Sequence, residues 1–156
     1  MIVVVGCGHP DRGDDAVGLL VAQEVAQANL PGVRVEQIGT DGLAMFLAWE
    51  GCDTCIVIDA MVSGRAPGTV MVLQKTDWEL LRTPPDCSTH SLGPAHALRL
   101  AAALGTLPQN VVVIGVEGEC FEPGADLSTA ARAGIGRAAE RVRDAARAQV
   151  TDVKPD

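Results

Sequence analysis

The chain alternates short aliphatic runs with longer segments in which apolar residues recur every three or four positions. The short runs predict buried strands, at residues 2–5, 33–38, 54–58, 69–74 and 111–116. The longer segments predict helices, at residues 15–29, 43–49, 93–104 and 128–148. Prolines and charged residues interrupt both periodicities over residues 75–89, where we expect irregular structure.

Strands that alternate with helices indicate an α/β fold with a mostly parallel sheet. We expect a three-layer αβα sandwich whose twisted sheet has about five strands. The loop at 60–68 is too short for a crossover helix, so the strand at 69–74 should run antiparallel to the strand at 54–58. Residues 1–150 then form one domain, and residues 151–156 form a polar, frayed tail.

Composition narrows the possible functions. Apolar residues make up 47% of the 156 positions but aromatic residues only 3%, which indicates an aliphatic core. The net charge of −8 repels phosphate backbones and argues against nucleic acid as a partner. No apolar run reaches the ~20 residues that span a bilayer, and the first residues lack the basic charge of a signal peptide. Five cysteines, an odd number, indicate reduced thiols, so we expect a cytoplasmic protein.

Acidic residues follow four of the predicted strands, namely Asp15, Asp41, Asp59 and Glu117. The carboxyl ends of parallel strands meet at the edge of the sheet where ligands bind, so these carboxylates should share one edge. His90, just before a predicted helix, adds an imidazole. Two carboxylates and one histidine suit a borderline divalent metal that keeps open coordination positions. We therefore select Asp15, Asp59 and His90 as the catalytic and metal-binding residues.

Other candidate residues have simpler interpretations. Asp14 precedes the first helix and is interpreted as its N-cap. His96 lies within a predicted helix and is interpreted as a surface residue. Cys52 and Cys55 form a C-x-x-C pair before a strand, whereas redox pairs lie after a strand at a helix N-terminus, so we interpret both thiols as inert.

Several segments resemble, in order and spacing, those of the hydrogenase maturation proteases. The longest and most specific is VGCGHPDRGDDAVG at residues 5–18. Shorter similar segments are GTDG at 39–42, VIDA at 57–60, THSLG at 89–93 and GVEG at 115–118. The resemblance extends over residues 1–145, nearly the whole chain.

This resemblance implies an endopeptidase that removes a C-terminal extension from the large subunit precursor of a nickel-iron hydrogenase once nickel has been inserted. The family's metal-contacting residues fall on Asp15, Asp59 and His90. A family motif linked to substrate handling falls on Asp41 and Gly42. Where the family usually has Asn, this chain has His9, to which we assign no role.

The expected partner is therefore the hydrogenase precursor, which supplies the nickel, and we expect no tightly bound cofactor. Two other functions fit the same three residues: a stand-alone metallohydrolase with a resident metal, and a non-catalytic nickel-binding chaperone. The residues leave the bond-breaking step open. A carboxylate could act as base for water, or the metal could polarise the scissile carbonyl.

Overall fold

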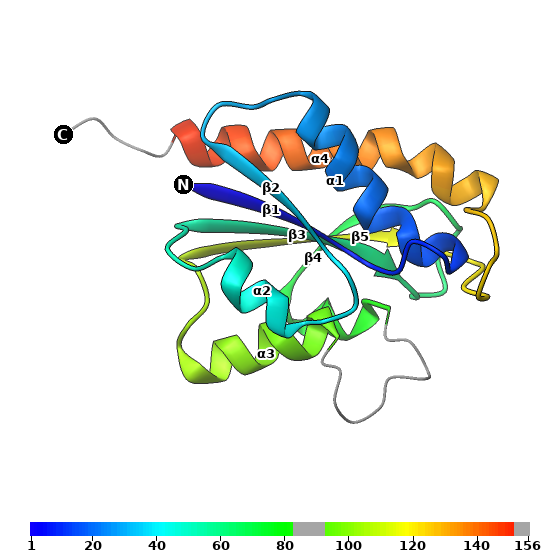
Figure 1. Cartoon of the computed structure of the whole chain (residues 1–156), viewed down its shortest axis with the longest axis horizontal. Coiled ribbons are helices and arrows are strands. Elements are labelled where there is room, and N and C mark those ends of the chain that lie inside the picture. Colours follow the sequence, from blue (N-terminus) through cyan, green and yellow to red (C-terminus); the bar gives the residue numbers. More distant parts are fainter. Residues whose placement is uncertain (83–92, 152–156) are drawn as a thin grey trace.

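The computed structural model describes residues 1–82 and 93–151 of the chain. Its centre is a five-stranded sheet in the order β2-β1-β3-β5-β4 (Figure 1). The strands are β1 (Ile2–Cys7), β2 (Val33–Ile38), β3 (Thr54–Met61), β4 (Val70–Leu73) and β5 (Asn110–Glu117). All neighbouring pairs are parallel except β4 with β5. The predicted α/β sheet with one antiparallel strand is confirmed.

β4 has the predicted direction, but its neighbour is β5 and not β3. β1 pairs with one edge of β3, and β5 pairs with the other edge along the whole strand. Both edges of β3 are therefore taken, and the outer edge of β5 is the position left for a strand that returns after a short loop. The sequence shows the reversal of direction, but it does not show which edge is free.

Helices cover both faces of the sheet and complete the three layers (Figure 1). α1 (Val17–Gln27) and α4 (Thr129–Thr151) lie together on one face, and α2 (Leu43–Ala48) and α3 (Pro94–Leu104) lie on the other. Alternate residues of each strand point to opposite faces. β1 therefore contributes Val4 to the core under α1 and α4, and Val3 to the core under α2 and α3. Both cores are mainly aliphatic, as the composition predicts.

Two segments differ from their predicted conformation. The predicted helix at 15–29 begins as a short 3₁₀ helix, η1 (Gly13–Ala16), before α1 takes over. The segment predicted to be irregular contains a second 3₁₀ helix, η2 (Lys75–Leu80), which buries Trp78. The predicted tail begins at Thr151, which is the last residue of α4, and residues 152–156 lie outside the described part of the chain.

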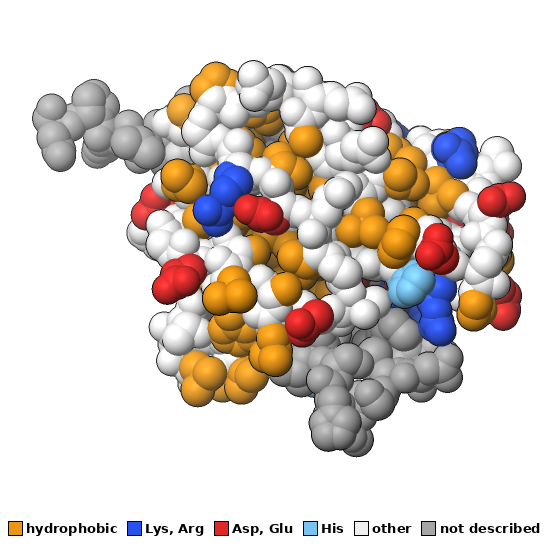
Figure 2. All heavy atoms as spheres, in the orientation of Figure 1, with side chains coloured by type: hydrophobic (Ala, Val, Ile, Leu, Met, Phe, Trp, Pro, Cys, Tyr) orange, Lys and Arg blue, Asp and Glu red, His pale blue; other side chains and the backbone are white. Residues whose placement is uncertain are grey.

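Exposed leucines gather on α2 and α3, where Figure 2 shows apolar side chains on the surface. They are Leu43, Leu47, Leu100 and Leu104. Neither helix is long: α2 has 6 residues and α3 has 11. Within residues 1–82 and 93–151, no helix is long and apolar enough to cross a membrane.

The carboxyl end of β1 approaches α1 so closely that only glycine fits between them. A Cβ atom on Gly18 would lie 2.4 Å from the Cys7 carbonyl oxygen and 2.5 Å from the Ile58 carbonyl oxygen. Both contacts are with backbone atoms of the sheet, which cannot rotate away. This contact sets the height of α1 above β1 and β3, and with it the position of η1.

Gly18→Ala should therefore destabilise the protein by roughly 3 kcal/mol, the upper range for overpacking a close-packed interior. Gly136→Ala is the matched control, because Gly136 is also helical but has open space around its Cα. That change should stabilise the protein by about 0.5–1 kcal/mol through helix propensity. Urea denaturation of both variants measures the difference, and equal effects would contradict the close contact described here.

Candidate functional site

Asp15 and Asp59 come together at the carboxyl ends of the parallel strands. Asp15 lies in η1, which follows β1, and Asp59 lies in β3, which continues three residues beyond the predicted end. Both side chains line one narrow cleft, whose other lining residues are Gly8, Gly39, Thr40, Arg82, Gly93 and Pro94. The structure therefore brings together two of the three residues selected from the sequence.

Gly8 allows the first loop to fold back over this cleft. Its φ is +138°, a backbone conformation that side-chain-bearing residues rarely adopt, and an added Cβ would lie 1.8 Å from the Asp15 carbonyl oxygen. The next residue, His9, donates its backbone N–H to Asp15 Oδ2 at 3.1 Å. The His9 ring is turned to its own loop, where Nδ1 accepts a hydrogen bond from the Asp11 backbone. His9 thus orients Asp15 through its main chain.

Asp59 is deeply buried, with 2% of its surface exposed. Its Oδ1 accepts a hydrogen bond of 2.8 Å from the Ala60 backbone N–H. Burial raises the pKa of its carboxyl well above the usual value, and the negative charge of Asp15 raises it further. The Ala60 hydrogen bond and the positive charge of Arg82 act on this pKa in the opposite direction.

Asp15 is buried to a similar degree, with 3% exposed, and burial raises its pKa too. The hydrogen bond from His9 and the charges of Arg82, His9 and Arg12 oppose that rise. Two adjacent buried carboxylates disfavour being ionised together unless a cation lies between them. The pair is suited to bind a metal ion or to hold a proton for general acid–base chemistry.

His90 lies outside the described residues, so its place relative to the two aspartates stays a prediction. Among the residues that the structure describes, no group of three or more His, Cys, Asp or Glu side chains is arranged to hold a metal. The assignment of Asp15, Asp59 and His90 as a metal site is accordingly carried forward as part of the proposed function.

The other two acidic residues at this edge have local partners. Asp41 is exposed and its Oδ1 accepts a hydrogen bond from the Leu43 backbone at the start of α2. Glu117 is buried and accepts hydrogen bonds from the Ser63 backbone and hydroxyl and from the Gly64 backbone. Glu117 therefore fixes the loop after β3, and neither residue lines the cleft with Asp15 and Asp59.

Asp14 is not the N-cap that the sequence suggests. It lies inside η1, is fully buried and accepts four hydrogen bonds from a distant loop. The donors are the backbone N–H groups of Glu119, Cys120 and Ser128 and the Ser128 hydroxyl. The partners are more than a hundred positions away in the chain, so local sequence patterns could not identify them.

Asp14→Ala removes the acceptor for all four donors and should destabilise the protein by roughly 2–4 kcal/mol. Asp11→Ala, in the same loop but with an exposed side chain, should change stability by less than about 0.5 kcal/mol. Urea denaturation measures both, and limited proteolysis should show faster cleavage within residues 118–128 of the Asp14 variant. Similar stability of the two variants would show that the four hydrogen bonds contribute little.

Arg82 is the cleft residue that the sequence analysis missed. It follows η2 in the Pro- and charge-rich segment, and its guanidinium carbon lies 4.3 Å from the centre of the Phe121 ring. Its backbone N–H donates to the Ala60 carbonyl at 2.8 Å, next to Asp59. A lone arginine in an apparently irregular segment carries no sequence signal of this placement. Only the pairing of its segment with the end of β3 brings it to the site.

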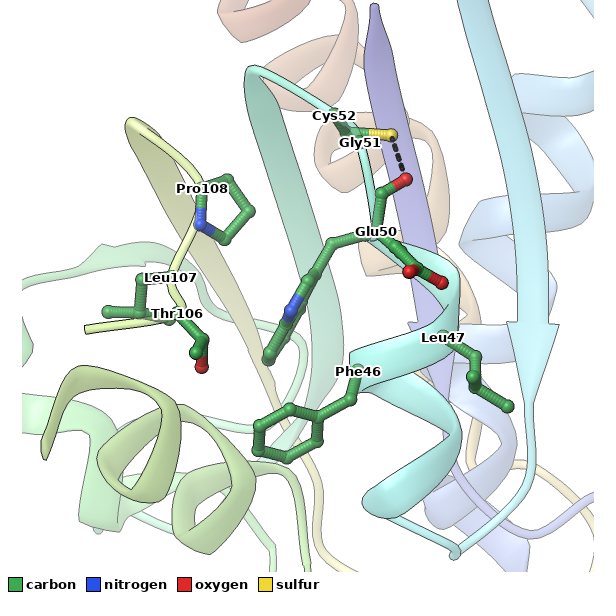
Figure 3. A pocket seen from close by; sticks show the side chains of 9 residues that line it. Phe46, Leu47, Glu50, Gly51, Cys52, Thr106, Leu107 and Pro108 are labelled. Carbon is green, nitrogen blue, oxygen red and sulfur yellow. Dashed lines mark hydrogen bonds between the residues drawn. The ribbon is translucent and has the colours of Figure 1, made fainter. Parts of the chain in front are cut away.

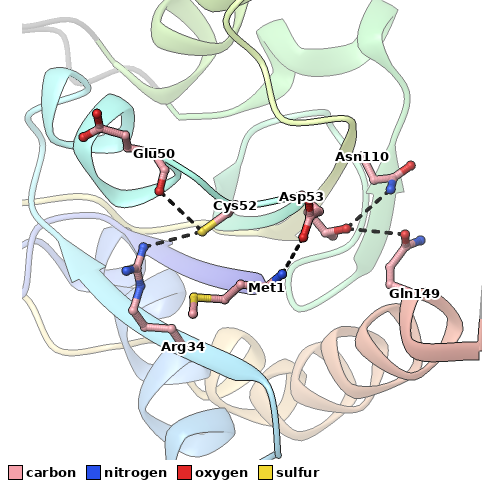
Figure 4. A network of polar contacts seen from close by, with 8 residues as sticks. Met1, Arg34, Glu50, Cys52, Asp53, Asn110 and Gln149 are labelled. Carbon is pink, nitrogen blue, oxygen red and sulfur yellow. Dashed lines mark hydrogen bonds and ion pairs between the residues drawn. The ribbon is translucent and has the colours of Figure 1, made fainter. Parts of the chain in front are cut away.

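Cys52 lies away from the cleft, and Cys7 and Cys55 are protected from ionisation. Cys52 lies at the opposite, amino end of the strands, in a polar network with Arg34 and Glu50 (Figure 4). Burial raises the pKa of Cys55 to about 12, and burial with the charge of Asp59 raises the pKa of Cys7 well above its usual value. Thiols held in the neutral form are poor nucleophiles, so the structure supports the interpretation that the C-x-x-C pair is inert.

A larger groove also lies at the amino ends of the strands, far from the two aspartates. It has a volume of about 450 Å³ and lies between the end of α2 and the loop before β5 (Figure 3). Phe46, Leu47, Leu107 and Pro108 are among its lining residues. Its lining contains one carboxylate, Glu50, and no paired acidic residues, so we place the candidate active site at the smaller cleft with Asp15 and Asp59.

Comparisons with known proteins agree with this fold. A family model described as HycI, hydrogenase maturation protease, matches residues 19–145. The chain is 31% identical to the hydrogenase 2 maturation protease of Escherichia coli, over 99% of this chain and 95% of that protein. It is 36% identical to a putative hydrogenase maturation protease of Methanocaldococcus jannaschii, over 77% of each. The structure of the hydrogenase maturating endopeptidase HybD from E. coli superimposes with a TM-score of 0.79 at 29% identity, covering 95% of this chain and 93% of that one.

These proteins are peptidases, and the same three-layer fold carries the acidic cleft here. The chain belongs to the hydrogenase maturation protease family, as the motifs in the sequence indicate, and is a peptidase of that class.

The raised pKa of Asp59 predicts how stability depends on pH. Because the folded protein holds this proton more tightly than the unfolded chain, the carboxyl's favourable effect is present at low pH and is lost as the pH rises through its raised pKa. Asp59→Asn keeps an acceptor for Ala60 and removes the charge. It should raise the free energy of unfolding at pH 8, because the folded protein no longer has to hold a charged carboxyl in its interior.

Urea denaturation in EDTA at several pH values tests this, and the gain should shrink as the pH falls toward 4, the usual range of aspartate. Asp144→Asn, on the exposed side of α4, serves as control and should give no pH-dependent gain. A gain for Asp59→Asn that is constant with pH would mean that the charge is not its cause.

Proposed function

We propose that this peptidase removes the C-terminal extension of a nickel-iron hydrogenase large subunit precursor after nickel insertion, and that it recognises nickel held by the precursor. The observation that carries the proposal is the pair of buried carboxylates, Asp15 and Asp59, in one cleft at the carboxyl ends of the strands. A cation that binds between two such carboxylates relieves their mutual repulsion and stabilises both in the ionised form.

His90 is the third residue of the proposed set. In the sequence it lies three positions before Gly93, which lines the cleft with the two aspartates. Oxygen and imidazole ligands suit nickel, and three protein ligands leave coordination positions for ligands of the substrate. The enzyme would thus bind the loaded precursor better than the empty one, which is a difference in affinity that can report complete metal insertion.

Asp41 and Gly42 are proposed to contact the substrate chain. They directly follow Gly39 and Thr40 in the chain, and these two residues line the cleft. The Asp41 side chain is exposed. Its hydrogen bond to the Leu43 backbone holds the turn in one conformation. A turn held in this way, next in sequence to two residues of the cleft lining, is suited to position an extended peptide.

For the bond-breaking step the same residues serve either of two routes. One carboxylate can take a proton from the attacking water, or the substrate-held metal can polarise the scissile carbonyl. The reduced thiols and the acidic surface fit the cytoplasm, where we propose that the reaction takes place. Family membership favours this peptidase over a stand-alone metallohydrolase and over a non-catalytic nickel chaperone.

The decisive experiment uses metal-stripped enzyme and purified precursor with and without nickel. The loaded precursor should lose its extension, and the empty precursor should stay intact with enzyme in excess. Asp15→Asn, Asp59→Asn and His90→Ala should each slow processing by about 10²-fold or more, the range for loss of a group that contacts the reacting centre. Asp144→Asn should process at the normal rate. Product mass spectrometry measures each, and equal cleavage of both precursor forms would refute nickel recognition.

A further inference from the structure

Arg82 enters the cleft because β3 is longer than β1. β1 pairs with β3 as far as Ile58, whereas β5 accompanies β3 on its other edge to Met61. The edge of β3 that β1 leaves open is taken by residues 80–82, which run antiparallel to it. Val62 donates its N–H to the Leu80 carbonyl, and Arg82 donates its N–H to the Ala60 carbonyl.

The side chain of Arg82 is held beside the two carboxylates. Arg82, Asp15 and Asp59 line the same cleft, and the guanidinium lies 4.3 Å from the centre of the Phe121 ring. An arginine in this position is supported by its backbone and by an aromatic face, so its charge has a fixed location.

A fixed positive charge in an acidic cleft discriminates between two forms of a metal ion. A free divalent cation is attracted by the carboxylates and repelled by the guanidinium at close range, where water screens little. An ion that arrives with anionic ligands of a protein carries a smaller net charge and is repelled less. The arginine therefore penalises the free ion more than the protein-bound ion.

We propose that Arg82 is a specificity residue that weakens the binding of free divalent metal ions to the Asp15–Asp59 cleft, so that the cleft accepts nickel only when a protein substrate holds it. The inference rests on the proposed function and adds to it the means by which the enzyme avoids being occupied by free metal. Arg82 takes no part in bond breaking, and its effect is on which metal species binds.

Calorimetric titration of the metal-stripped enzyme with Ni²⁺ at pH 8 tests this without any precursor. Arg82→Gln and Arg82→Met should bind Ni²⁺ at least ~10-fold more tightly than the wild type, because a repelling unit charge near the site is removed. Arg82→Lys should restore weak binding. Arg141→Gln removes an equal charge from the exposed surface of α4 and should match the wild type.

A second measurement is inhibition of processing by added Ni²⁺. With nickel-loaded precursor as substrate, the two neutral variants should be inhibited at ~10-fold lower Ni²⁺ concentration than the wild type, because free ions then occupy the cleft. Circular dichroism establishes that each variant is folded. The methionine variant keeps an apolar stem against Phe121 if the glutamine variant proves unstable.

Unchanged Ni²⁺ affinity in a folded neutral variant would overturn the role of Arg82, whether or not the enzyme processes its precursor. Tighter binding that Arg141→Gln reproduces would overturn it as well, since the effect would then not depend on this charge at this place. Failure of the wild-type enzyme to cleave nickel-loaded precursor, together with tighter Ni²⁺ binding in the Arg82 variants, would instead refute the proposed function and leave the charge effect standing.

Discussion

The burial of two carboxylates side by side is the constraint on which the structure around the site depends. Asp15 and Asp59 come from different strands, and each would be more stable in water than in the interior. The surrounding chain compensates locally: the backbone N–H groups of His9 and Ala60 point at the carboxylates, and the charge of Arg82 lies beside them. Packing of the aliphatic cores on both faces of the sheet provides the stability that such a site requires.

The two ends of the parallel strands have different roles. At the amino ends, short polar contacts join the chain start to the sheet, as between the Met1 amino group and Asp53, and Thr54 lies between Asn110 and Gln149 (Figure 4). The groove in Figure 3 also belongs to this end. At the carboxyl ends, loops and 3₁₀ helices place acidic groups around a cleft. The acidic groups that can bind a ligand thus gather at the carboxyl ends, as in other open α/β sheets.

Much of the fold and part of the site could be predicted from the sequence. The predictable features depend on residues close together in the chain, and the others depend on residues far apart in it. Strand and helix positions follow from local periodicity, and Asp15 and Asp59 follow from the rule that strand ends meet. The neighbour of β4, the partners of Asp14 and the placement of Arg82 all depend on residues far apart in the chain. Each of these three features depends on which strand edge or which hydrogen-bond donor is still available once the sheet has formed. A local sequence pattern does not contain that information.

The hydrogen bonds that Ser128 donates to Asp14 have a consequence for the order of events during synthesis. The two residues are 114 positions apart, so the loop that carries Asp15 has its full set of partners only when most of the chain has left the ribosome. At about 5–20 residues per second, β1 and β2 are exposed for several seconds before those partners exist. A nascent chain therefore carries no finished cleft, and the peptidase becomes active only as a nearly complete molecule.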